Sequence, residues 1–217
     1  MRIQVISEGP TDREFLHAIV IKIRGEAIDL LEESKTQRTH RGNQSLLSNY
    51  KIFAKFLHNA YYKCSDMIII CVDNDGEALD ELGIGSRKKE ILKNNIELFL
   101  DNNSYKYPDR SPRYILAVPV QTIDYWMKCI DQNHKECHKI REIEKIPKEI
   151  IKVETYGKKN VHLGWLIDST IFNNKIDKFA SDPSVIDKLS CLPSFKDFMD
   201  QFKAAYDYSN AHKDLIS

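Results

Sequence analysis

The sequence predicts an α/β fold, in which a mostly parallel β-sheet is flanked by helices and followed by a helical C-terminal portion. The first observation is a pair of short apolar runs at residues 3–6 and 67–72, rich in β-branched residues and bounded by turn residues. Such runs are typical of strands buried in a parallel sheet. The second is the helical periodicity that follows each run. With 217 residues, 42% of them hydrophobic, the chain can form one sizeable core.

The N-terminal part of the chain predicts a strand followed by a helix. The strand covers residues 1–6, and the amphipathic helix runs from residue 11 to about residue 24. Thr11 is the expected N-cap, with Glu14 reaching back to it as in a capping box.

The middle of the chain predicts two further helices and two further strands. After a polar loop at residues 34–44, Ser45 is expected to cap a helix with apolar positions at Leu46, Tyr50, Phe53 and Leu57. The strand at residues 67–72 comes next, and then a helix from residue 86 to about residue 101. Residues 113–118 predict the next strand.

The rest of the chain predicts helices joined by polar segments, from about residue 130 onward. Just before them, Asp124 and Lys128 are four residues apart on one predicted helix, which is typical of a surface ion pair. Pro193 begins the last predicted helix, which packs Phe195, Phe198 and Phe202 into the core.

An acidic motif follows each of the two apolar runs. Glu8-Gly9-Pro10-Thr11-Asp12 follows the first run, and Asp73-Asn74-Asp75-Gly76 follows the second. The crevice of an open α/β sheet lies beyond the carboxyl ends of such strands. Asp73 and Asp75, two residues apart on an extended segment, are expected to lean the same way. Several carboxylates at close range disfavour joint ionisation unless a cation is bound, and Mg²⁺ suits an oxygen-only site.

Each motif also has a purely structural interpretation. The first is compatible with a helix start, and Asp-Asn-Asp-Gly is common in turns where Asx side chains bond to their own backbone. The occurrence of both motifs, each after a buried strand, favours a site for Mg²⁺ or Mn²⁺.

Composition limits the classes of function. The formal net charge is zero, from 32 basic and 32 acidic residues, which argues against strong nonspecific binding to a long polyanion. No apolar stretch approaches the roughly 20 residues of a membrane span, and the chain begins directly with a strand, so we expect a soluble, cytoplasmic protein without membrane association. The cysteines are odd in number and scattered, so disulfides are not expected; they are Cys64, Cys71, Cys129, Cys137 and Cys191. A zinc site at Cys129, His134, Cys137 and His138 lacks paired two-residue spacing, and a solvated helix end is the favoured interpretation.

Local basic clusters remain compatible with a nucleic-acid partner. They lie in the loop of Arg38, His40 and Arg41, at the helix start Arg87-Lys88-Lys89, and at Lys158-Lys159. Such clusters are commonly solvated faces. Their expected position near the acidic motifs favours contact with phosphate.

These residues carry a resemblance to a known family. Glu8-Gly9 after the first strand, with Asp73-x-Asp75 after a later one, resembles the Toprim domain of topoisomerases, primases and nucleases. The chain more closely resembles the small standalone Toprim-like proteins, a domain-of-unknown-function family related to the nuclease domain of the overcoming-lysogenization-defect proteins. The segments that support this likeness are residues 5–16, 40–43, 72–79, 118–126 and 192–198. The chain departs from the family at Asp124, where members carry Glu, and at Tyr125, where small residues are common.

The resemblance implies a Toprim-like, Rossmann-like metal-binding core at residues 1–130 and a helical C-terminal extension at residues 131–217 packed on it. The implied activity is that of a nuclease, a magnesium-dependent nucleic-acid phosphodiesterase that serves as an antiviral defence effector. The expected catalytic residues are Glu8, Asp73, Asp75 and Lys159. The expected metal ligands are Glu8, Asp12, Asp73, Asp75 and Asp124. The expected nucleic-acid contacts are His40, Arg41, Arg87, Lys88 and Lys158.

Two other functions stay open on the sequence. The chain contains no Gly-rich loop that ends in Gly-Lys-Ser/Thr, so an ATPase would have to be a separate subunit, and the chain would then be a partner-gated effector that is inactive alone. The acidic motifs also fit a non-catalytic module that binds a metal or a phosphate compound. DNA and RNA both remain candidate substrates, and a homo-oligomer is a further option.

Overall fold

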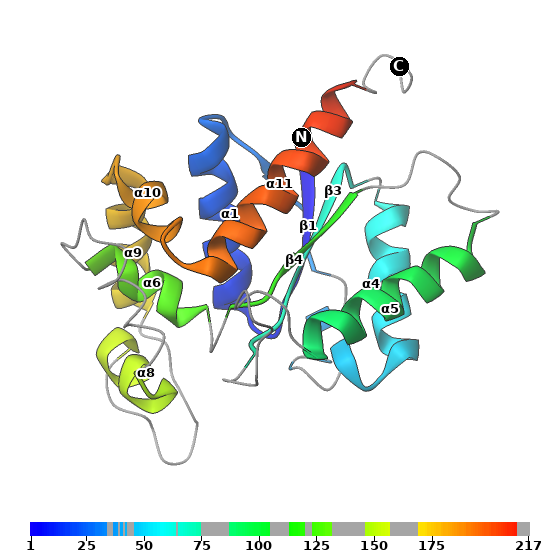
Figure 1. Ribbon diagram of the computed structural model, residues 1–217, viewed down its shortest axis with the longest axis horizontal. Coiled ribbons are helices and arrows are strands. Elements are labelled where there is room, and N and C mark those ends of the chain that lie inside the picture. Colours follow the sequence, from blue (N-terminus) through cyan, green and yellow to red (C-terminus); the bar gives the residue numbers. More distant parts are fainter. Residues whose placement is uncertain are drawn as a thin grey trace.

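A parallel β-sheet forms the centre of the computed structural model (Figure 1), which describes residues 1–33, 37–38, 40, 42, 46–63, 65–74, 87–104, 113–119, 123–131, 146–156 and 169–211. Within these residues the sheet has four strands in the order β2-β1-β3-β4, and every neighbouring pair is parallel. The strands are β1 (Arg2–Ile6), β2 (Asp29–Leu30), β3 (Met67–Cys71) and β4 (Arg113–Ala117). The predicted α/β fold with a parallel sheet is therefore confirmed.

Strand β3 shows why an uninterrupted apolar run forms a strand here. Its alternate residues Met67, Ile69 and Cys71 belong to one core cluster. Ile68, Ile70 and the following Val72 belong to a second cluster on the opposite face. A central parallel strand covered on both faces requires apolar side chains at successive positions, not only at alternate ones.

Helices cover both faces of this sheet (Figure 1). On one face lie α4 (Tyr50–Tyr62) and α5 (Arg87–Asn102), whose buried residues join the second cluster. On the other face the first cluster includes residues from α1 (Pro10–Arg24), α6 (Asp124–Asp131), α8 (Lys148–Tyr156), α9 (Ser169–Ser181), α10 (Val185–Leu189) and α11 (Pro193–Ala211). The C-terminal helices therefore share a core with the first strand and helix. No helix in the described part of the chain is long and apolar enough to cross a membrane.

The chain order of the strands creates a switch point between β1 and β3. From β1 the chain passes through α1 to β2 on one side, and it then crosses to β3 on the other side of β1. Ile6 pairs with Ile70, so the two carboxyl ends lie next to each other. Because α1 and α5 cover opposite faces, the segments that leave these strand ends diverge and form the position where open α/β sheets bind ligands.

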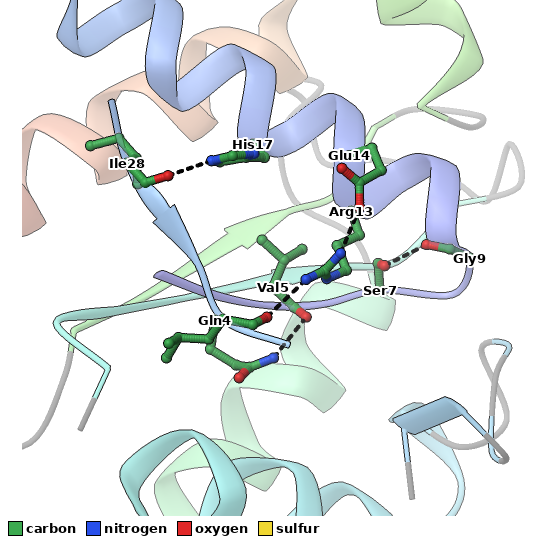
Figure 2. Close-up of polar contacts among 9 residues, drawn as sticks. Gln4, Val5, Ser7, Gly9, Arg13, Glu14, His17 and Ile28 are labelled. Carbon is green, nitrogen blue, oxygen red and sulfur yellow. Dashed lines mark hydrogen bonds and ion pairs between the residues drawn. The ribbon is translucent and has the colours of Figure 1, made fainter. Parts of the chain in front are cut away.

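The predicted start of α1 is wrong by one residue, and its cap is different. The helix begins at Pro10 with Gly9 as N-cap, and the Gly9 N–H donates to Asp12 Oδ2 at 2.9 Å. Proline suits the first helical position because it lacks an N–H and has a fixed φ. Glu14, which the capping box assigned to the cap, instead forms an ion pair with Arg13 at 2.6 Å (Figure 2).

Two further boundaries differ from the prediction. The helix expected from Ser45 is interrupted. Residues 46–47 are helical, residues 48–49 are not, and α4 begins at Tyr50. The Asn49 side chain caps α4 by accepting the Ile52 N–H at 3.2 Å. Ser45 itself lies outside the described residues. Strand β2 was not predicted, because a strand of only two residues leaves no periodic pattern.

The last helix, α11, starts at Pro193 and packs Phe195, Phe198 and Phe202 into the core as predicted. Phe195 meets Trp126 edge-on, with ring centroids 5.1 Å apart. The indole N–H of Trp126 also donates to Ser194 Oγ at 3.1 Å, which satisfies a buried polar group. These contacts fix α11 against α6.

Gln201 of α11 protects the edge of the sheet at β4. Its Oε1 accepts the Leu116 N–H at 2.9 Å, and its Nε2 donates to the Leu116 carbonyl at 3.2 Å. The same Nε2 lies 2.9 Å from Asp197 Oδ2, which also forms an ion pair with Lys89 of α5 at 2.6 Å. The side-chain amide therefore supplies the two hydrogen bonds that a further strand would make.

We expect Gln201→Ala to lower the free energy of unfolding by about 1–3 kcal/mol, because it leaves buried backbone groups of Leu116 without these partners. Urea unfolding followed by circular dichroism measures the change. The exposed Lys203 on the same helix provides the matched control, Lys203→Ala, which should change stability by less than about 0.5 kcal/mol. Equal stabilities of the two variants would contradict this role of Gln201.

Candidate metal centre

Four carboxylates lie within electrostatic range of one another at the carboxyl edge of the sheet. Glu8 follows β1, Asp12 lies in the first turn of α1, Asp73 follows β3, and Asp124 begins α6 after β4. We call Glu8, Asp12, Asp73 and Asp124 the acidic cluster. All four were predicted as metal ligands.

Hydrogen bonds link the members of the acidic cluster through the backbone. Glu8 Oε1 accepts the Asp73 N–H at 3.0 Å, which connects the ends of β1 and β3. Asp73 Oδ1 in turn accepts the Ile123 N–H at 3.2 Å, immediately before Asp124. The segments that follow β1, β3 and β4 are thus connected in series, and Glu8 and Asp73 are oriented before any ligand binds.

The turn between β1 and α1 is held by its own polar contacts, and α1 is tied to β2 (Figure 2). The Ser7 hydroxyl donates to the Gly9 carbonyl at 2.7 Å. His17 Nε2 lies 2.7 Å from the Ile28 carbonyl, just before β2. These bonds stabilise the turn that carries Glu8 and tie the helix that carries Asp12 to the segment before β2.

The predicted basic loop lies beside Glu8. The Gly42 N–H donates to the Glu8 carbonyl at 3.2 Å, and Gly42 has φ +90°, a conformation that favours glycine. His40, two residues earlier, is exposed. Contact of His40 with nucleic acid stays a prediction. Arg41 lies outside the described residues.

The electrostatics of the acidic cluster appear most clearly at Asp12. Burial of its carboxyl is the largest cause that raises the pKa of Asp12 from 3.8 to about 7, although the residue as a whole keeps some exposed surface. The neighbouring charges of Asp124 and Glu8 add to the rise, and the Gly9 N–H and Lys152 oppose it. Without a bound cation, the acidic cluster is therefore a site where a proton is held near neutral pH.

Cys71, the last residue of β3, experiences the same field. It is a buried free cysteine, and burial is the main cause that raises its pKa well above the usual range. Four carboxylates add to this rise, in order Asp12, Asp73, Glu8 and Asp124. The thiol therefore stays protonated beneath the acidic cluster, and Cys71 is a packing residue.

The predicted surface ion pair between Asp124 and Lys128 is wrong. Asp124 is buried, at 5% exposure, and its Oδ2 lies 3.9 Å from Lys152 Nζ on α8. Lys128 pairs with Glu154, also on α8, at 3.0 Å. Helical spacing alone shows only partners on the same helix, so the sequence could not indicate that α8 supplies both partners.

Lys88 was predicted to contact nucleic acid, but its side chain is buried. It is only 7% exposed, and its Nζ donates to the Asp73 carbonyl at 3.0 Å. Lys88 therefore fixes the backbone at the end of β3, and its binding to nucleic acid stays a prediction. Arg87, the preceding residue, is exposed.

Several predicted residues lie outside the described part of the chain: Asp75, Lys158, Lys159, His134, Cys137 and His138. Cys129 is described and is a buried free cysteine, whereas Cys191 is disulfide-bonded. The expectation of cysteines without disulfides is therefore wrong at Cys191, whose partner lies outside the described residues.

The chemistry of the acidic cluster fits a hard divalent cation. Its donors are carboxylate oxygens from neighbouring strand ends, the ligand type that Mg²⁺ prefers. Repulsion from Asp124 and Glu8 contributes to the raised pKa of Asp12, although burial is the largest cause. Among the described residues, no three His, Cys, Asp or Glu side chains are grouped so that they could hold a metal ion together. Asp75, the remaining predicted ligand, is not among the described residues.

In comparisons with protein-family models, curated proteins and solved structures, nothing matches this chain. Membership of the Toprim-like family therefore stays a prediction. Function has to be inferred from the acidic cluster itself.

We expect the pH dependence of stability to reveal Asp12. Because its folded-state pKa of about 7 lies above the ordinary value of 3.8, the folded state holds the proton more tightly between these values. This contribution to stability is complete below about pH 4 and is lost as the pH rises through about 7, by at most about 4 kcal/mol. Asp12→Asn should remove this loss.

Thermal unfolding in EDTA at pH 5 and at pH 8 measures the effect. The wild type should lose more stability between these pH values than Asp12→Asn does. The exposed Asp200 provides the control, Asp200→Asn, which should follow the wild type. Parallel pH profiles for wild type and Asp12→Asn would contradict the raised pKa.

Proposed function

We propose that the chain is a Toprim-like nuclease, a phosphodiesterase that cleaves nucleic acid with Mg²⁺ or Mn²⁺. The observation that carries this proposal is the hydrogen bond between Glu8 and the backbone of Asp73. It holds the Glu8 carboxylate against the backbone of Asp73, so two acidic residues that follow neighbouring strands are adjacent at the switch point of a parallel sheet. The Glu and Asp motifs of the Toprim domain occupy the corresponding strand ends.

Glu8, Asp12, Asp73 and Asp124, together with Asp75, would hold the metal. When bound, the cation would polarise the scissile phosphate and lower the pKa of an attacking water. The residues of the chain orient these ligands: the N–H groups of Gly9, Asp73 and Ile123 each bind a carboxylate oxygen. These contacts come from uncharged backbone N–H groups, so they orient the carboxylates without neutralising them.

The basic residues around the acidic cluster would position the substrate. His40 and Arg87 are exposed and flank the segments that carry Glu8 and Asp73, so both are suited to contact phosphate. The resemblance assigns the neutralisation of charge on the reacting phosphate to Lys159 or to Lys158 beside it. A zero net charge favours recognition of nucleic-acid shape over a tight grip on any duplex. A role in defence against phage rests on the resemblance.

The test is cleavage of supercoiled DNA, single-stranded DNA and total transfer RNA with Mg²⁺, with Mn²⁺ and with EDTA. We expect at least one substrate to be cut only with metal. Asp73→Ala and Glu8→Ala should each lower the rate by about 100-fold or more, because each removes a ligand and a link between strand ends. Asp200→Ala, on exposed α11 surface, should cut at the wild-type rate.

Cleavage that survives in both Asp73→Ala and Glu8→Ala would contradict the proposal. If the wild type cuts nothing but Mg²⁺ still raises its melting temperature, a different function is favoured. The chain would then be an effector that requires a separate ATPase subunit, or a metal-binding module without catalysis. Adding ATP and cell extract to the cleavage assay distinguishes these two.

A further inference from the structure

Lys152 is a cation that the chain itself supplies to the acidic cluster. It lies on α8, and its Nζ is 3.9 Å from Asp124 Oδ2. The side chains are only 21% and 7% exposed, respectively, so little water screens the pair. Lys152 also lowers the pKa of Asp12, so its charge acts on two members of the acidic cluster.

The contact between Lys152 and Asp124 is loose compared with its neighbour. Lys128 and Glu154 connect the same two helices in the opposite sense, at 3.0 Å. At 3.9 Å the Lys152 ammonium is beyond hydrogen-bond distance of Asp124 Oδ2, so no hydrogen bond between these two atoms is lost when they separate. Helix α8 does not depend on this contact, because Ile151 is fully buried in the core cluster between α8 and its neighbours.

We propose that Lys152 is an internal counter-cation that competes with the divalent metal for Asp124. The inference rests on the proposed function, since it concerns the same metal site. A divalent ion among these carboxylates repels the ammonium and binds the oxygens more strongly than the ammonium does. Metal binding therefore displaces Lys152 from the acidic cluster into solvent, and the affinity for metal is set by this exchange.

The exchange gives Lys152 a role that differs from a structural ion pair. In the metal-free protein it partly compensates charges that would otherwise repel one another. A single ammonium cannot neutralise the whole acidic cluster. Removing a structural pair would leave metal affinity unchanged or weaken it, whereas removing a competitor strengthens it.

Calorimetric titration of Mg²⁺ into wild type, Lys152→Met and Lys128→Met at pH 8 tests this difference. We expect Lys152→Met to bind Mg²⁺ about tenfold more tightly, because a repelling charge is gone. Lys152→Arg, which keeps the charge, should bind within about twofold of the wild type. Lys128→Met, which breaks the neighbouring pair between the same helices, should also bind within about twofold.

The wild-type protein allows a second measurement that does not depend on the folding of a variant. Reductive methylation, read by peptide mass spectrometry, reports how accessible each lysine is. Mg²⁺ should accelerate methylation of Lys152 by at least about threefold, because the displaced ammonium enters solvent. Lys128 should be methylated at the same rate with and without the metal.

Three outcomes would overturn the inference. If Lys152→Met binds Mg²⁺ no more tightly than a wild type that does bind it, the inference is overturned and the proposed function is not. If Mg²⁺ leaves the methylation of Lys152 unchanged or slows it, the inference is again overturned without the proposed function. A wild type that binds no Mg²⁺ or Mn²⁺ overturns both the inference and the proposed function.

Discussion

The hydrogen bond from the Asp73 N–H to Glu8 Oε1 is the contact on which the candidate site depends. It bridges the carboxyl ends of β1 and β3, which the parallel register places next to each other. The Asp73 side chain extends the connection to the start of α6, and Lys88 holds the Asp73 carbonyl from α5. Elements from both faces of the sheet therefore converge on one residue after β3, and its geometry follows from the sheet beneath it.

Without a bound cation the acidic cluster disfavours the folded state, because burial and mutual repulsion disfavour the charged carboxylates. The chain offsets it in two ways, with a proton on Asp12 and with the Lys152 ammonium. Helices α1 and α8, which carry Asp12 and Lys152, are also anchored by buried apolar residues. Their positions therefore do not depend on the proton or on the ammonium. Neighbouring carboxylates with a raised pKa make this edge of the sheet a candidate functional site.

The features visible from the sequence are those with a local physical signature. The run at β3 predicted a strand buried on both faces, and the spacing of Phe195, Phe198 and Phe202 predicted the inner face of α11. The acidic motifs predicted which strand ends carry Glu8 and Asp73, because their place after buried strands is a property of the chain order. Partners distant in sequence, such as Lys152 for Asp124 and Gln201 for Leu116, leave no such pattern. The cap of α1 was missed because Gly9 and Asp12 compete with an equally regular signal at Thr11 and Glu14.

Anomalous diffraction from crystals soaked in Mn²⁺ would show whether the acidic cluster is a metal centre. A map recorded near the manganese absorption edge locates the ion without reference to any activity. We expect a peak among the carboxylates of Glu8, Asp73 and Asp124, with the Lys152 side chain turned away from Asp124. A map with no peak there at saturating Mn²⁺, in well-ordered crystals, would contradict the account.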